Sequence, residues 1–136
     1  MEGALELSEK TAALKAILEA KPGATAEPMA AARGSKPLVL IFKVMGKMFA
    51  ILSVRGTENV ILKSDPHLAE ILREQYAGVG HRSHLDRRFW IAVDLDSDVP
   101  PEEVERLAAQ SYDLVCAGLT RKQKAELAEV GQRVPD

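Results

Sequence analysis

Hydrophobic positions spaced three and four residues apart predict four helices. In residues 8–20 an apolar stripe follows Ser8, whose side chain is suited to cap the first turn. Asp65-Pro66 opens a second helix, because Asp accepts hydrogen bonds from free backbone N–H groups and Pro fits the first helical position. The clearest stripe, after Pro100-Pro101, consists of Val104, Leu107, Ala108, Ser111, Leu114 and Val115. The last helix, over 120–131, begins with a Thr-x-x-Gln capping box.

Four short apolar segments predict strands. Leu38–Lys43 is almost entirely apolar, and Met48–Val54 and Val60–Lys63 follow it after short turns. Because the connections are short, we expect these three strands to pair as an antiparallel meander. Phe89–Leu95 alternates in character from one residue to the next, which is typical of a half-exposed strand.

The order of these elements predicts an α+β fold. We expect α-β-β-β-α-β(β)-α-α, with an antiparallel sheet (the three-stranded meander plus one or two further strands) and helices packed on it. The length of 136 residues suits one domain, residues 1–136. Residues 24–36 lack periodicity and are rich in small residues, so we expect a mobile loop there, with at most a short extended piece.

Charge is unevenly distributed along the chain. The formal net charge is −2, but residues 1–64 carry +3 and residues 65–136 carry −5. This distribution favours a molecule with one basic and one acidic face. A single cysteine, Cys116, excludes an intrachain disulfide, and we found neither a signal-peptide pattern nor a membrane-spanning apolar run. We therefore expect a cytoplasmic protein.

Enzymatic and metal-binding motifs are incomplete. Gly46-Lys47 lacks the other Walker residues, and Gly78-x-Gly80 lacks a third glycine and a preceding strand. His81-x-x-His84 has metal-ligand spacing, with His67 as a third candidate, but nothing completes the set. Alternating Asp94, Asp96 and Asp98 would suit a hard cation if they shared a face, although a solvated strand end is the simpler interpretation. We expect no catalytic residues, cofactor or metal.

The segment His81–Trp90, HRSHLDRRFW, is the strongest candidate for a binding surface. Its arginines, Arg82, Arg87 and Arg88, have the planar fork that pairs with phosphate. Trp90 could stack on a base, and His84 lies in the same loop. Lys43 and Lys47, beside the first hairpin turn, form a second basic projection. The alternative is a solvated loop in which Arg87 pairs with Asp86 or Asp94.

An ordered set of short motifs resembles the MmcQ/YjbR family of small bacterial proteins. These motifs are Gly46-Lys47-Met48-Phe49-Ala50, Leu62-Lys63-x-Asp65-Pro66, Leu72-Arg73-Glu74-Gln75-Tyr76, His84-Leu85, Arg87-Arg88-x-Trp90, Val99-Pro100 and Ser111-Tyr112-Asp113-Leu114-Val115. The resemblance implies a CyaY-like or secretion-chaperone-like α+β fold and DNA binding through a double-wing arrangement of hairpins. The chain departs from the family pattern at Glu27-Pro28-Met29, where relatives carry Pro-Trp, and at Asp86, where relatives often carry asparagine.

Residues and resemblance together predict a non-enzymatic, monomeric module that binds double-stranded DNA weakly through phosphates. The expected contact residues are Lys43, Lys47, Arg82, His84, Arg87, Arg88 and Trp90. One alternative is a chaperone-like protein-interaction module, which an exposed apolar patch would favour. The other is a small-ligand-binding protein with a pocket around His84 and Trp90.

Overall fold

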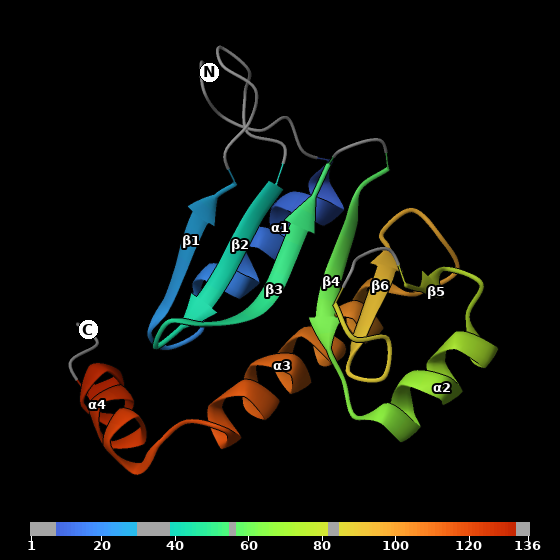
Figure 1. The fold of residues 1–136 in the computed structure, drawn as a ribbon. Coiled ribbons are helices and arrows are strands. Elements are labelled where there is room, and N and C mark those ends of the chain that lie inside the picture. The colour runs from blue at the N-terminus through green and yellow to red at the C-terminus, as the bar shows by residue number, and fades with distance from the viewer. Residues whose placement is uncertain (1–7, 30–38, 55–56, 82–84, 133–136) are drawn as a thin grey trace.

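The computed structural model describes residues 8–29, 39–54, 57–81 and 85–132. These residues form a six-stranded antiparallel sheet, in the order β1-β2-β3-β4-β6-β5, and four helices (Figure 1). The helices are α1 (Glu9–Glu19), α2 (Pro66–Gln75), α3 (Pro101–Ala117) and α4 (Arg121–Gln132). The strands are β1 (Ala24–Pro28), β2 (Val39–Val44), β3 (Lys47–Ser53), β4 (Asn59–Lys63), β5 (Val79–Gly80) and β6 (Trp90–Asp94). The predicted α+β class and order of elements are confirmed.

Strand β1 lies within the segment that the sequence predicts to be a loop. It pairs antiparallel with β2, from Ala24 opposite Val44 to Pro28 opposite Leu40. Most β1 side chains are exposed, so the segment lacks the apolar alternation that marks a half-buried strand. Its position at the sheet edge also tolerates Pro28, which has no N–H to donate. The short extended piece that the sequence allows in this segment is therefore a paired edge strand, whose pairing the sequence did not predict, and residues 30–36 lie outside the described residues.

The helices begin where the capping residues predict. The Ser8 hydroxyl accepts a hydrogen bond from the Thr11 N–H at 3.3 Å. An Asp65 carboxylate oxygen accepts hydrogen bonds from the backbone N–H groups of His67 and Leu68, at 3.1 and 3.2 Å. Thr120 and Gln123 form the reciprocal capping box, with distances of 3.0 and 3.1 Å. No helix in the described ranges has an apolar stretch long enough to cross a membrane.

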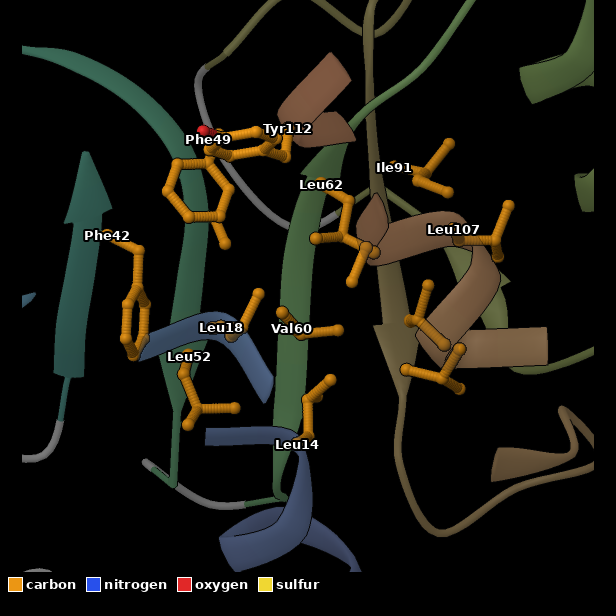
Figure 2. Packing of buried hydrophobic residues seen from close by; sticks show 14 of the residues in the cluster. Leu14, Leu18, Phe42, Phe49, Leu52, Val60, Leu62, Ile91, Leu107 and Tyr112 are labelled. Carbon is orange, nitrogen blue, oxygen red and sulfur yellow. The ribbon is translucent and has the colours of Figure 1, made fainter. Parts of the chain in front are cut away.

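The hydrophobic core lies between one face of the sheet and helices α1 and α3. Alternate residues of the four central strands point into it, and Figure 2 shows several of them against α1 and α3. The core-facing strand residues are Phe42, Val44, Ala50, Leu52, Val60, Leu62, Ile91 and Val93. Phe49 of β3, Leu14 and Leu18 of α1, and five residues of α3 also belong to this layer: Val104, Leu107, Ala108, Tyr112 and Val115. Ala69 and Leu72 attach α2 at its side.

A row of isoleucines crosses the opposite face of the sheet. Ile41, Ile51 and Ile61 are direct partners in adjacent strands, and Ala92 of β6 continues the row. Ile41 and Ile51 are partly exposed, whereas Ile61 and Ala92 are buried without joining the core cluster. We call the surface that contains this row the open face.

A β-bulge interrupts the sheet at Phe49. Phe42 pairs with Ala50 but Lys43 pairs with Met48, so Phe49 has no partner in β2. Phe49 and Ala50 are both fully buried, which places two successive side chains in the core. The Phe49 ring contacts Tyr112 of α3 edge to face, with ring centroids 5.3 Å apart.

Ser111 of α3 bridges β3 and β4 beside the bulge, just beyond the end of their direct pairing. Its hydroxyl accepts a hydrogen bond from the Lys63 N–H at 2.8 Å and donates one to the Phe49 carbonyl at 2.5 Å. Direct pairing of the two strands ends one residue earlier, at Ala50 and Leu62. The fully buried hydroxyl therefore replaces a backbone hydrogen bond of the sheet and fixes α3 against it.

We predict that Ser111→Ala lowers the free energy of unfolding by about 1–3 kcal/mol, because it leaves a partly buried N–H and a buried carbonyl without this partner. Urea denaturation followed by circular dichroism measures the change. Asp113→Ala, at an exposed position of the same helix, is the control and should stay within about 0.5 kcal/mol of the parent. Equal effects of the two substitutions would contradict the role of the hydroxyl.

Candidate nucleic-acid interface

Antiparallel pairing sorts the charged residues to opposite ends of the sheet. Asn59 at the start of β4 pairs with Asp94 at the end of β6, and Lys63 at the end of β4 pairs with Trp90 at the start of β6. We call Lys43, Lys47, Lys63, Arg87, Arg88 and Trp90 the basic end, where the β2–β3 hairpin also lies (Figure 1). We call Glu58, Asp94, Asp96 and Asp98 the acidic end.

The β2–β3 hairpin projects Lys47 from the basic end. Its turn residues, Met45 and Gly46, have φ angles of 50° and 79°, the left-handed conformation that matches the twist of the paired strands. Lys47 is exposed. Lys43, two residues before the turn, instead lies 3.1 Å from a Glu27 carboxylate oxygen of β1. The edge strand thus offsets one of the two lysines that the sequence predicts to bind phosphate.

Arg88 forms a fork-like pair with Asp86 in the turn before β6. One Asp86 oxygen accepts from the backbone N–H and Nε of Arg88 at 2.9 and 3.1 Å, and the other accepts from Nη2 at 2.8 Å. These hydrogen bonds lower the pKa of Asp86 to about 2. Because the hydrogen bonds favour the ionised carboxylate, the pair is intact above about pH 4 and is lost as the pH falls through about 2. At neutral pH the arginine charge is therefore offset locally.

Arg73 of α2 holds the same turn through its backbone. Its Nη2 donates to the carbonyls of Arg87 at 2.6 Å and of Trp90 at 3.0 Å. Its Nε is buried without a hydrogen-bond partner, and burial is the main cause that lowers the pKa of this guanidinium. Arg73 thus uses its charge to fix the loop.

A polar cleft of about 440 Å³ separates α2 from this turn. It is lined by Pro66, Glu70, Arg73, Glu74, Arg87 and Arg88. Glu70 and Glu74 of α2 place negative charge in the same lining as the arginines, although neither forms an ion pair with Arg87 or Arg88 in the described residues. A phosphate chain therefore meets carboxylates in the cleft that it does not meet on the outer surface of the basic end.

Lys63 and Trp90 lie side by side on the open face. They are direct cross-strand partners, and both side chains are partly buried. Three cations of the basic end have no ion-pair partner within the described part of the chain. These cations are Lys47, Lys63 and Arg87. These three cations and the tryptophan form the surface best suited to a polyanion.

The structure brings together five of the seven predicted contact residues: Lys43, Lys47, Arg87, Arg88 and Trp90. Arg82 and His84 lie outside the described residues. The alternative prediction that Arg87 pairs with Asp86 or Asp94 is wrong, because Asp86 pairs with Arg88 instead. Sequence reasoning did not assign a role to Arg73. In the sequence, Arg73 directly follows the buried Leu72 in α2, which hints that the arginine is partly buried. The sequence does not show which carbonyls its side chain contacts.

The carboxylates of the acidic end do not converge on a common point. Asp94 accepts from the Asp96 N–H at 2.9 Å, and Asp98 accepts from the backbone N–H groups of Ala77 and Gly78 at 2.9 and 2.8 Å. Asp96 pairs with Lys10 at 3.6 Å. In the ranges that the structure covers, no three His, Cys, Asp or Glu side chains are grouped to hold a metal ion.

The six-stranded antiparallel sheet, the helices packed on it and the basic end define a small α+β protein. The chain belongs to the YjbR family, whose model matches residues 19–114. It is 37% identical over 71 residues to the uncharacterized protein YjbR of Escherichia coli strain K12, covering 52% of this chain and 60% of that protein. It is 29% identical over 83 residues to the uncharacterized protein YbdF of Escherichia coli O157:H7, covering 60% of this chain and 68% of that protein.

Solved structures share this fold. The crystal structure of Deinococcus radiodurans protein DR2400 superposes with a TM-score of 0.71 at 28% identity, covering 85% of each chain. A crystal structure of a Pseudomonas syringae protein superposes with a TM-score of 0.54 at 22% identity, covering 65% of this chain and 86% of that one. The family and the fold are therefore established, and the resemblance seen in the sequence is confirmed.

We predict that Arg73→Ala loosens the turn that carries Arg87 and Arg88. The loss of the charge-assisted hydrogen bonds to two carbonyls should lower the free energy of unfolding by about 1.5–3 kcal/mol. Trp90, the single tryptophan of the chain, should become more accessible to acrylamide quenching of its fluorescence. Arg106→Ala removes an exposed ion pair with Glu103 and should leave the quenching unchanged. Unchanged quenching in both variants would refute the role of Arg73.

Proposed function

We propose that this protein binds double-stranded DNA through phosphate contacts at the basic end. The observation that carries the proposal is the set of uncompensated cations, Lys47, Lys63 and Arg87, grouped at one end of the sheet. Arginine and lysine that neutralise phosphates release condensed counterions, which is the main source of non-specific affinity for DNA. The acidic end would orient the molecule by repelling the same polyanion.

The spacing of the strands suits this mode of binding. Lys47, Lys63 and Arg87 are on or next to β3, β4 and β6, which are neighbours in the sheet. Adjacent strands are about 4.8 Å apart, so β3 and β6, which are two spacings apart, are separated by roughly 10 Å across the sheet. Duplex DNA carries one charge per about 1.7 Å of helix axis, so several phosphates lie within that span. Trp90 adds an aromatic ring beside Lys63.

The expected affinity is low and depends strongly on salt. Engaging about three to five phosphates gives a log–log slope of affinity against salt of roughly −3 to −4.5. Fluorescence anisotropy of a labelled duplex across a salt series measures this slope. The triple variant Lys47→Ala, Lys63→Ala, Arg87→Ala should abolish most of the binding, and Lys15→Ala, which breaks an ion pair within α1, should not. Absence of binding at low salt would refute the proposal.

Asp86 offers a test in the opposite direction. Asp86→Asn should strengthen DNA binding, because it releases the Arg88 guanidinium while keeping an oxygen for the Arg88 N–H. One additional phosphate contact steepens the salt slope by roughly 0.9. Asp96→Asn makes the same charge change at the acidic end and is the matched control. Equal gains in the two variants would show that net charge, and not Arg88, governs binding.

Protein binding is a second candidate function, and the isoleucine row of the open face favours it. Ile41 and Ile51 are partly exposed neighbours on a flat sheet surface, with Lys43 and Lys63 on the same face. An apolar strip beside basic residues suits an acidic amphipathic partner segment. The anisotropy measurement separates the two candidates, since this one predicts no salt-dependent affinity for duplex DNA.

A further inference from the structure

A cavity of about 270 Å³ lies between α1 and the start of α3, next to the acidic end. Its floor is apolar and consists of Ala13, Leu14, Leu95, Val99, Pro101 and Val104. Glu9, Lys10 and Glu105 are the charged residues that line it. The volume is close to the lower limit of about 300 Å³ for small-molecule sites, so it suits a small ligand with an apolar body.

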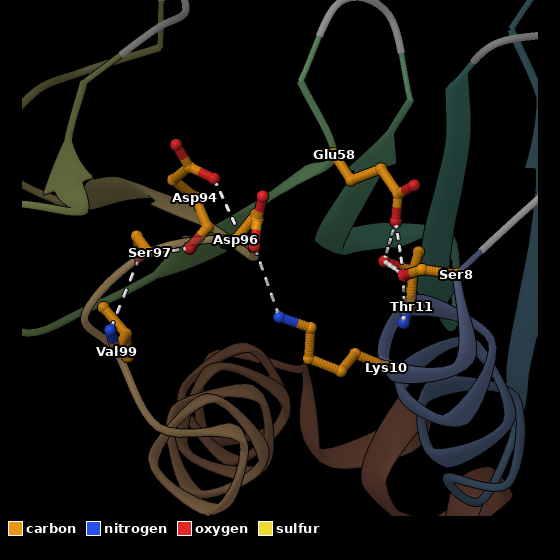
Figure 3. Close-up of polar contacts among 8 residues, drawn as sticks. All are labelled: Ser8, Lys10, Thr11, Glu58, Asp94, Asp96, Ser97 and Val99. Carbon is orange, nitrogen blue, oxygen red and sulfur yellow. Dashed lines mark hydrogen bonds and ion pairs between the residues drawn. The ribbon is translucent and has the colours of Figure 1, made fainter.

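The charge around this cavity is negative. Two of the three charged lining residues are acidic, and the third, Lys10, has its Nζ 3.6 Å from a carboxylate oxygen of Asp96, which lies outside the lining (Figure 3). Glu9 lies on α1 and Glu105 on α3, and among the described residues neither has an ion-pair partner. Two uncompensated carboxylates therefore flank an apolar floor, which favours a cationic group over an anionic one.

Polar contacts fix the wall that α1 contributes. Glu58 at the start of β4 accepts hydrogen bonds from the hydroxyls of Ser8, at 2.8 Å, and of the fully buried Thr11 (Figure 3). The Thr11 hydroxyl is the main cause that lowers the pKa of Glu58. The first turn of α1 is thus attached to the sheet.

Further hydrogen bonds shape the segment between β6 and α3, which contributes Val99 to the floor. The Ser97 hydroxyl donates to the Asp94 carbonyl at 2.6 Å and accepts from the Val99 N–H at 3.4 Å (Figure 3). Cavity walls held in this way need little ordering when a ligand binds, which lowers the entropic cost of binding.

We propose that this cavity binds a small organic cation that carries an ammonium group on a short apolar chain. The chain lies on the floor against Leu14, Val99 and Val104, and the ammonium lies between Glu9 and Glu105. This site is separate from the basic end, so it stands or falls independently of DNA binding.

The test is a titration of the isotope-labelled protein followed by amide chemical shifts, with three probes of equal chain length. Hexylammonium should give saturable shifts at the residues that line the cavity. It should bind about three- to tenfold more tightly than 1-hexanol, the range for one or two exposed ion pairs, and more tightly than hexanoate. Equal affinity for hexanol, tighter binding of hexanoate, or no saturable shift at the cavity would overturn the proposal.

Two pairs of variants locate the ligand. Glu9→Gln with Glu105→Gln should reduce hexylammonium affinity to that of hexanol. Ala13→Leu fills the cavity from an exposed position of α1 and should abolish binding, whereas Ala12→Leu, at the neighbouring exposed position outside the cavity lining, should preserve it. Amide spectra confirm that each variant is folded. Unchanged binding in Ala13→Leu would show that the probe lies elsewhere.

Discussion

The arrangement of sheet and helix depends on the Ser111 hydroxyl, which bridges the Lys63 N–H and the Phe49 carbonyl. The bulge at Phe49 turns two successive side chains into the core. Beside it, direct pairing of β3 with β4 ends at Ala50 and Leu62, so the hydroxyl of α3 makes the hydrogen bonds that further strand pairing would have made. The same contact fixes the lengthwise position of α3 on the sheet. Phe49 and Tyr112, which pack edge to face, reinforce that position.

Charge separation follows from strand direction. β4 and β6 run antiparallel, so the lysine that ends one strand lies beside the tryptophan that begins the other, and Asp94 lies at the opposite end. A one-residue slip of β6 against β4 would turn Trp90 from the open face toward the core. The burial of Leu62 and Ile91 on the core face excludes that slip. Strand direction therefore determines which end of the sheet is basic, and core packing determines the face on which Lys63 and Trp90 lie.

Much of the fold could be predicted from the sequence, because apolar spacing and capping residues are local signals. Ser8, Asp65 and Thr120 mark helix starts that the structure confirms. Strand β1 could not be predicted, since an exposed edge strand is stabilised by backbone pairing and carries little side-chain pattern. Ser111 was visible as a polar residue in an apolar stripe, yet its partners are 48 and 62 residues away in the chain. Contacts between residues so far apart in the chain produce no periodic pattern in the sequence.

The candidate site shows the same limit, because a count of basic residues overstates the charge available to a polyanion. Glu27 offsets Lys43, Asp86 offsets Arg88, and Arg73 is occupied by two carbonyls. Pairing depends on which strands are neighbours and on how a turn folds, and composition reports neither. What remains at the basic end is Lys47, Lys63 and Arg87, a surface suited to modest and salt-sensitive attraction. Asp86, which the family resemblance marks as a departure from asparagine, is therefore one position at which this chain reduces the charge of its basic end.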